Sequence, residues 1–208
     1  ISGTPAGPDV KQFIVRAREP FRRFGERTLT LTVAAALQAS SAVRAGEVGV
    51  RYTGAIRGAG GVRPLTWSVA SGTLPAGLSL STTTGAIGGV PRAAGRFALT
   101  FAVTDSAGQR VTVPASIRIA ARLAITSTRL PQATEGEAYR AQLVARGGLG
   151  PKQWRVVRGK LPRGLRLDQT TGTLRGTPRE AGTYRITVQA TDRLGGKSTK
   201  TFRLTVLG

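Results

Sequence analysis

The feature that most constrains this chain is an internal repeat with a period of 87 residues. The stretch LPAGLSLSTTTGAIGGVP at 74–91 recurs as LPRGLRLDQTTGTLRGTP at 161–178. The same offset superimposes Trp67 on Trp154 and the pair Thr104-Asp105 on Thr191-Asp192. A fixed period of this length indicates copies of one structural unit. We therefore predict two full repeats, at 34–121 and 122–208.

Half of a further copy precedes them. Residues 1–33 align with 174–206 at an offset of 173 residues. This alignment places Gly3-Thr4-Pro5 on Gly176-Thr177-Pro178, Glu19 on Asp192, and TLTLTV at 28–33 on TFRLTV at 201–206. Residues 1–33 are therefore predicted to be the C-terminal half of a repeat.

Each copy alternates apolar with polar or small residues at a period of two. Examples are FALTFAV at 97–103, YRITVQA at 184–190 and TFRLTV at 201–206. This alternation is typical of strands with one buried face, and Gly and Pro separate the runs at short intervals. About seven short strands in each repeat predict an all-β fold of tandem antiparallel β-sandwiches.

The residues that persist between copies have backbone or core roles. The residue before a proline avoids the helical region, so Leu-Pro starts an extended segment. The Thr-Gly pair supplies a turn, and alternate leucines point to one side of a strand. We therefore expect the residues that persist between repeats to build the scaffold and the residues that vary to face water.

These residues also carry a resemblance to a known family. The string W-x-V-x-x-G-x-L-P-x-G-L-x-L-x-x-x-T-G-x-[IL]-x-G-x-P-x-x-A-G-x-[FY], followed by T-D-x-x-G, occurs in both full copies. It resembles the immunoglobulin-like tandem repeats of bacterial surface and secreted proteins, which are related to cadherin-like repeats. The resemblance implies immunoglobulin-like sandwiches with an extracellular, non-catalytic role.

The composition argues against catalysis and metal binding. The chain contains no His and no Cys, which removes the commonest general base and the thiolate ligands. The close carboxylates Glu135 and Glu137 fall in a predicted turn, and the junction at 119–132 has no carboxylate. Asp105 and Asp192 are explained by hydrogen bonds to the turn that follows them. We expect no catalytic residue, metal or cofactor.

Basic residues are the more informative class. The formal net charge is +21, with +3 in 1–33, +6 in 34–121 and +12 in 122–208. Six cations of the last repeat replace residues of the middle repeat that are all uncharged, and they form a candidate anion-binding face: Lys152, Arg155, Arg158, Lys160, Arg163 and Arg166. A charge of this size attracts polyanions.

The partners expected for such a face are an anionic polymer or an acidic protein surface. Acidic polysaccharide, wall polymer, lipid headgroups and nucleic acid all remain open as the polymer. The sequence offers no recognition helix and no row of exposed aromatics, so sequence-specific nucleic-acid recognition is not expected. Trp67 and Trp154 either stack on sugars or, as their repeat-invariant place favours, lie in the sandwich core.

The half repeat raises a separate possibility. It supplies one apolar face and unpaired strand edges, which is too little to be stable alone. Either it is part of a longer array, or strands of a neighbouring identical subunit complete it. Five apolar residues are candidates for such inter-subunit strand pairing: Phe13, Val15, Leu29, Leu31 and Val33.

Taken together, these features predict a non-catalytic structural or adhesive segment of a bacterial surface protein or filament, located outside the cell or at its surface. One alternative is a carbohydrate-binding accessory module of a secreted hydrolase. Another is a filament subunit that polymerises through the half repeat. The sequence contains no apolar run long enough to span a membrane.

Overall fold

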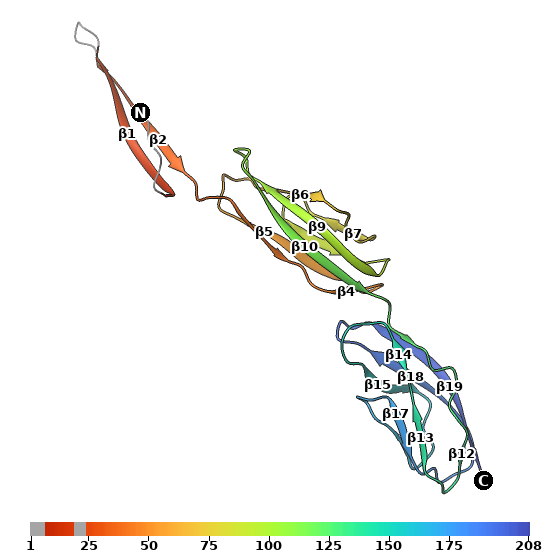
Figure 1. Ribbon diagram of the computed structural model, residues 1–208. Helices are drawn as coiled ribbons and strands as arrows, with labels where there is room; N and C mark the ends of the chain where they lie inside the picture. Colours follow the sequence, from red (N-terminus) through yellow and green to blue (C-terminus); the bar gives the residue numbers. More distant parts are fainter. Residues whose placement is uncertain (1–6, 19–23) are drawn as a thin grey trace.

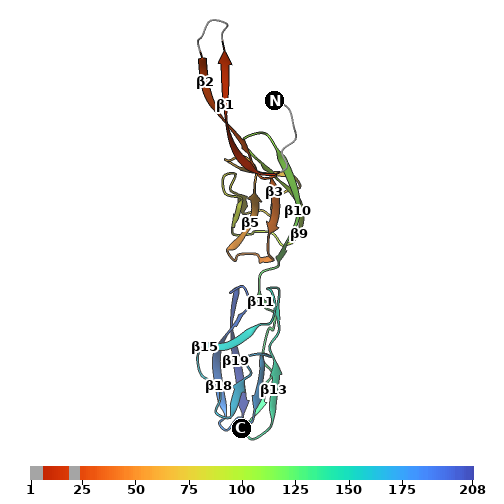
Figure 2. The same cartoon turned by 90° about the vertical axis from the view of Figure 1, so that its left-hand side faces the viewer.

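Strands form wherever the sequence alternates at a period of two, and together they build an extended row. The structure is a computed structural model that describes residues 7–18 and 24–208. A two-stranded hairpin is followed by two β-sandwiches arranged end to end (Figures 1 and 2). Gly3 to Pro5 and Glu19, which support the alignment of the half repeat, lie outside the described residues. No described segment forms a helix of the length and apolarity needed to cross a membrane.

The half repeat forms the hairpin. Its strands, β1 (Asp9–Arg18) and β2 (Phe24–Val33), pair antiparallel with Phe13 opposite Leu29. An offset of 173 places them on the last two strands of the chain, β18 (Gly182–Thr191) and β19 (Lys197–Leu207). The described residues of the half repeat thus have the same strands as their counterparts in the last repeat.

The middle repeat is a sandwich of two four-stranded sheets. One has the order β4-β10-β9-β6 and the other β3-β5-β8-β7. The strands are β3 (Gln38–Ala42), β4 (Gly46–Glu47), β5 (Tyr52–Ala59), β6 (Thr66–Ser71), β7 (Leu78–Leu80), β8 (Ala86–Gly89), β9 (Gly95–Thr104) and β10 (Arg110–Ala120).

The last repeat has the same layers. Its first sheet has the order β12-β19-β18-β15, and facing it lie the sheet β13-β17-β16 and the pair β11-β14. The strands not yet given are β11 (Ala124–Ile125), β12 (Ala133–Thr134), β13 (Tyr139–Gln142), β14 (Ala145–Arg146), β15 (Gln153–Arg158), β16 (Leu165–Leu167) and β17 (Thr173–Gly176). The segment equivalent to β5 is therefore divided between β13 and β14.

The antiparallel sheets expected from the sequence carry one parallel pair in each full repeat. β4 runs parallel to β10, and β12 runs parallel to β19. In each full repeat the first strand, β3 or β11, lies in one layer, and the chain then crosses to the other layer without reversing direction. The second strand, β4 or β12, therefore runs parallel to the strand that leaves the repeat.

Each full repeat has its own apolar core, which includes a tryptophan. Trp67 and Trp154 are 7% and 4% exposed, so both rings lie between the sheets and neither is available to stack on a sugar. Each indole packs against the glycine of the Thr-Gly turn that leads into the facing sheet, Gly85 before β8 or Gly172 before β17. Both glycines have a positive φ, of 71°. The Thr-Gly turn is invariant because it serves both the backbone and the core.

The aspartate of the Thr-Asp pair fixes a second turn. In the middle repeat, Asp105 Oδ1 accepts hydrogen bonds from the backbone N–H groups of Ala107 (3.0 Å) and Gln109 (2.8 Å). Its Oδ2 accepts one from Val62 N–H at 2.8 Å, 43 residues away. The expected turn-forming role is confirmed, and the same carboxylate also holds the glycine-rich loop before β6.

We predict that Gly172→Ala destabilises the last repeat by about 2–4 kcal/mol, because an alanine there is strained at positive φ and overpacks the core. The added Cβ would lie 2.6 Å from Trp154 Cε2. The matched control is Gly195→Ala, because Gly195 has a φ of 83° and no neighbouring atom within 4 Å of the added Cβ. Calorimetric unfolding should show a larger loss for Gly172→Ala. Equal losses would contradict the packing role.

Candidate functional site

The outer surface of the first sheet in the last repeat collects cations, threonines and glutamine. Ile186, Val188 and Ala190 of β18 are buried, so the residues between them point outward. The same alternation turns Phe202 and Leu204 of β19 inward. We call four outward residues on β15, β18 and β19 the arginine face: Arg155, Arg158, Arg185 and Arg203. No acidic residue occurs in any of these three strands.

Strand pairing brings the arginine face together. Arg185 of β18 lies directly opposite Arg203 of β19. On the other side of β18, Arg155 lies opposite Gln189, and its guanidinium Nη2 donates a hydrogen bond to Gln189 Oε1 at 2.7 Å. A bulge between Val156 and Arg158 shifts the register, so that Arg158 lies opposite the outward residue Thr187.

Two adjoining hollows mark the surface of this face. One, of about 360 Å³, is lined by Arg158, Arg185, Thr187 and Thr201. The other, of about 430 Å³, shares Arg185 and Thr201 and adds Thr183, Phe202 and Arg203. The two threonine hydroxyls, Thr187 Oγ1 and Thr201 Oγ1, are 2.9 Å apart and hydrogen-bonded.

The middle repeat has the same hollow without the charges. A surface cavity of about 490 Å³ is lined there by the residues Ser71, Ala98, Leu99, Thr100, Pro114, Ala115 and Ser116. At the 87-residue offset, Ser71, Ala98 and Ser116 correspond to Arg158, Arg185 and Arg203. The shape therefore belongs to the fold, and the arginines belong to the last repeat alone.

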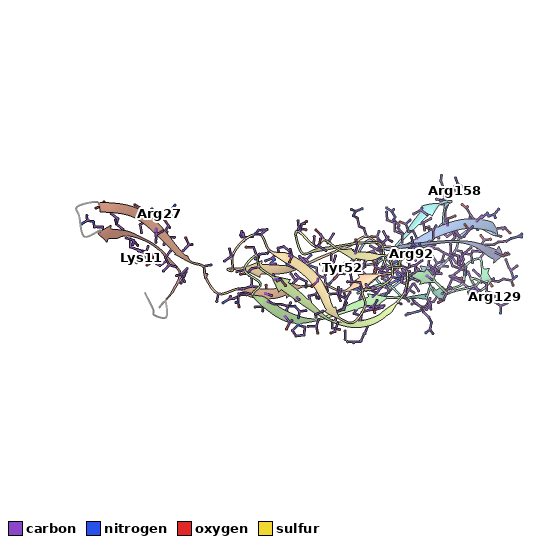
Figure 3. All side chains as sticks on the ribbon, turned by 90° about the horizontal axis from the view of Figure 1, so that it is seen from above. Lys11, Arg27, Tyr52, Arg92, Arg129 and Arg158 are labelled. Atoms are coloured by element: carbon purple, nitrogen blue, oxygen red, sulfur yellow. The ribbon has the colours of Figure 1, made fainter. Side chains whose placement is uncertain are left out.

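The six cations singled out in the sequence are spread over both sheets and the turns between them. Only Arg155 and Arg158 belong to the arginine face. Lys152 Nζ donates to the carbonyl of Gly150 at 3.1 Å, and Lys160 lies in the turn after β15. Arg163 pairs with Glu180 at 3.3 Å, and Arg166 lies on β16 in the facing sheet. Basic residues also occur along the rest of the row, as Figure 3 shows.

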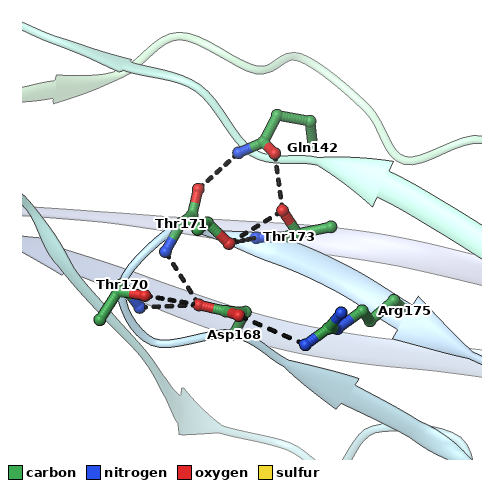
Figure 4. Close-up of polar contacts among 6 residues, drawn as sticks. All are labelled: Gln142, Asp168, Thr170, Thr171, Thr173 and Arg175. Atoms are coloured by element: carbon green, nitrogen blue, oxygen red, sulfur yellow. Dashed lines mark hydrogen bonds and ion pairs between the residues drawn. The ribbon is translucent and has the colours of Figure 1, made fainter.

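The facing sheet carries its own arginines, beside a turn tied by hydrogen bonds. Arg175 of β17 lies opposite both Arg140 and Arg166, and its Nη2 is 3.6 Å from Asp168 Oδ2 (Figure 4). Asp168 Oδ1 accepts hydrogen bonds from the N–H groups of Thr170 and Thr171, each at 3.0 Å. These donors hold the pKa of Asp168 well below its usual value. The carboxylate therefore partly neutralises this sheet, unlike the arginine face.

The five apolar residues of the half repeat are mostly exposed. Val15, Leu29 and Leu31 are 44%, 42% and 51% exposed, whereas the equivalent Val188, Phe202 and Leu204 are at most 2% exposed. Phe13 and Val33 are half-buried. Within the described part of the chain, β1 and β2 pair only with each other. The hairpin thus presents to solvent the face that a full repeat uses as its core.

The junction between the two sandwiches contains a buried carboxyl pair. Glu47 of β4 is 1% exposed, and its Oε1 accepts a hydrogen bond from Leu123 N–H of the last repeat at 2.7 Å. Its other oxygen, Oε2, has no donor among the described residues. Asp192, which is 7% exposed, comes from the last repeat and lies beside the Glu47 side chain. Sequence reasoning missed this pair because its members are 145 positions apart.

Protonation of Glu47 would let its second oxygen donate a hydrogen bond to Asp192. Burial, followed by the hydrogen bond to Asp192, raises the pKa of Glu47 to about 7, against the opposing effect of Leu123 N–H and the Arg122 charge. Burial alone would raise the pKa of Asp192. The hydrogen bond from Glu47 and the backbone donors Leu149, Gly196 and Leu194 outweigh burial, so the pKa of Asp192 lies below its usual value. A surface cavity of about 340 Å³ lies at this junction, and its charged lining residues are Glu47, Arg122 and Lys197.

Comparison with known proteins agrees with this architecture. The family described as "Putative Ig domain" matches residues 35–120 and 122–207. The serine-rich adhesin for platelets of Staphylococcus aureus strain MRSA252 is 34% identical over 137 residues, which are 64% of this chain and 10% of the adhesin. In strain MSSA476 the identity is again 34% and the share of the adhesin is 6%. The chain therefore spans a tenth or less of the length of these relatives.

A solved structure shows the same fold. Extracellular domains 3–5 of Drosophila OTK superimpose with a TM-score of 0.50 at 15% sequence identity. The match covers 95% of this chain and 71% of that one. At this identity the likeness concerns the fold of tandem immunoglobulin-like domains.

We predict that the junction weakens as the pH rises. The folded pKa of Glu47, about 7, lies above its ordinary value of 4.5. The contribution of Glu47 to the stability of the junction is therefore fully present below pH 4.5 and is lost as the pH rises through about 7. The contribution of Asp192 is present above its ordinary pKa of 3.8 and is lost only as the pH falls below that value. The Leu123 amide should titrate by NMR with a midpoint near 7 in the wild type, and not in Glu47→Gln. The control Glu137→Gln should keep that midpoint, and a wild-type midpoint near 4.5 would contradict the buried pair.

Proposed function

We propose that this chain, which belongs to the family described as "Putative Ig domain", is a non-catalytic structural and adhesive segment of an extracellular bacterial protein. The observation that carries the proposal is a row of sandwiches whose last member concentrates positive charge on exposed strands. The matched staphylococcal relatives are named as adhesins, which supports the same role and a location at the cell surface.

The row is suited to spacing. β10 ends at Ala120 and β11 begins at Ala124, so the connection between sandwiches is short. On one side of it, Leu123 N–H donates to Glu47 of the middle repeat. On the other side, Gly148 N–H of the last repeat donates to the carbonyl of Ala121 at 2.8 Å. A short connection that is hydrogen-bonded on both sides resists bending more than a flexible linker does.

The charge is suited to adhesion. The last repeat carries a net charge of +12, twice that of the middle repeat on the same scaffold. Exposed charges attract a polyanion over distances near the Debye length, about 8 Å at physiological salt. Binding of this kind tolerates many partners and weakens as salt is added. The acidic partner is therefore attracted first by its charge.

We predict that the whole chain behaves as an elongated monomer that binds to an immobilised polyanion at low salt. A heparin column should retain it at ~0.05 M NaCl and release it steeply as the salt rises, because each anionic contact releases a counterion. A neutral glycan column serves as the control and should not retain it. Elution at the same volume from both columns would contradict charge-assisted adhesion.

A second candidate function is favoured by the hairpin. Val15, Leu29 and Leu31 are exposed although they occupy core positions of the repeat, and both hairpin edges are unpaired within the described residues. Strands from an identical subunit could cover that face and form a filament. Polymers that survive dilution in size-exclusion chromatography would favour this candidate over the monomeric spacer.

A further inference from the structure

We propose that the arginine face of the last repeat is a binding site for the sulfate or carboxylate groups of a linear acidic polysaccharide. The inference rests on the proposed adhesive function and names its ligand class and its site. The site is the pair of hollows centred on Arg158, Arg185 and Arg203.

The three arginines are placed so that one extended chain can contact all of them. They come from three adjacent strands, one each from β15, β18 and β19. Neighbouring strands lie about 4.8 Å apart, so a polymer crossing the sheet meets a guanidinium at each strand. Arg185 lines both hollows, which makes the two a continuous depression.

The face carries an electrostatic cost that an anion would relieve. Arg185 and Arg203 are direct cross-strand partners, and like charges in that position destabilise a sheet. Arg155, Arg158, Arg185 and Arg203 take part in none of the ion pairs found among the described residues. The middle repeat has Ala98 opposite Ser116 at the same place, so the fold does not need this pair of charges.

The chemistry between the arginines favours a sugar polymer. Guanidinium groups bind sulfate and carboxylate with paired N–H donors. The Thr187 and Thr201 hydroxyls and the Gln189 amide add groups that both donate and accept hydrogen bonds, as the hydroxyls of a sugar ring require. The outward positions of β18 and β19 include no aromatic ring on which a nucleotide base could stack.

The deciding experiment compares two triple variants of the whole chain that lose the same charge. The face variant, Arg158→Ser with Arg185→Ala and Arg203→Ser, carries the residues of the middle repeat. The matched variant, Arg140→Thr with Lys160→Thr and Arg166→Ser, also carries middle-repeat residues, and it leaves the arginine face intact. Calorimetric titration at ~0.15 M NaCl would use heparin fragments as the sulfated probe and polygalacturonate as the carboxylated one.

We expect the face variant to lose at least about tenfold in affinity for both probes and the matched variant less than about threefold. Equal losses would show that only long-range charge acts, which overturns the site and leaves charge-assisted adhesion standing. If the wild type binds neither probe and is not retained on heparin at low salt, the adhesive function falls as well. Equally tight binding of a DNA duplex, lost in the same face variant, would overturn the choice of polysaccharide. Thermal unfolding of both variants checks the fold, and Arg185→Ala alone repeats the test if the face variant unfolds.

Discussion

The packing of a tryptophan of one sheet against the glycine of the turn that leads into the other sheet is the constraint on which both sandwiches depend. The indole fills the space that a side chain at Gly85 or Gly172 would occupy, and that glycine also adopts a positive φ. One residue therefore sets both the turn and the distance between the sheets. Because this contact fixes the inner faces, the outward positions are free to vary, and the two repeats differ there by arginines.

The division between fixed scaffold residues and variable outward residues also explains how the repeats join. Asp192 keeps the turn-forming role of its counterpart Asp105, with Oδ1 accepting from the N–H groups of Leu194 and Gly196. At the junction its side chain also meets the carboxyl group of Glu47, which has Thr134 as its counterpart in the last repeat. A scaffold residue thus takes part in the contact between sandwiches. The contact combines a turn aspartate that both full repeats have with a glutamate that, of the two, only the middle repeat has.

The sequence predicted the fold well because its signals can be read by comparing the chain with itself. The 87-residue period, the two-residue alternation and the repeated Trp and Thr-Gly positions need no knowledge of strand pairing, and the hairpin follows from the alignment of residues 1–33. Arg185 and Arg203 were not singled out because they lie outside the basic stretch at 152–166 and meet only through strand pairing. The sequence also did not show that Arg155 and Arg166 lie on different sheets, because the turn between β15 and β16 carries the chain across the sandwich.

The central claim is that the fixed residues build the sandwich and the variable outward residues determine what it binds. The most direct measurement transfers the arginines: Ser71→Arg, Ala98→Arg and Ser116→Arg are introduced into a chain that carries the face variant in its last repeat. Heparin affinity and the unfolding of the middle repeat are then measured together. We expect heparin affinity to return to within about threefold of the wild type while the folded core is retained. A well-folded graft that fails to restore binding would contradict the central claim.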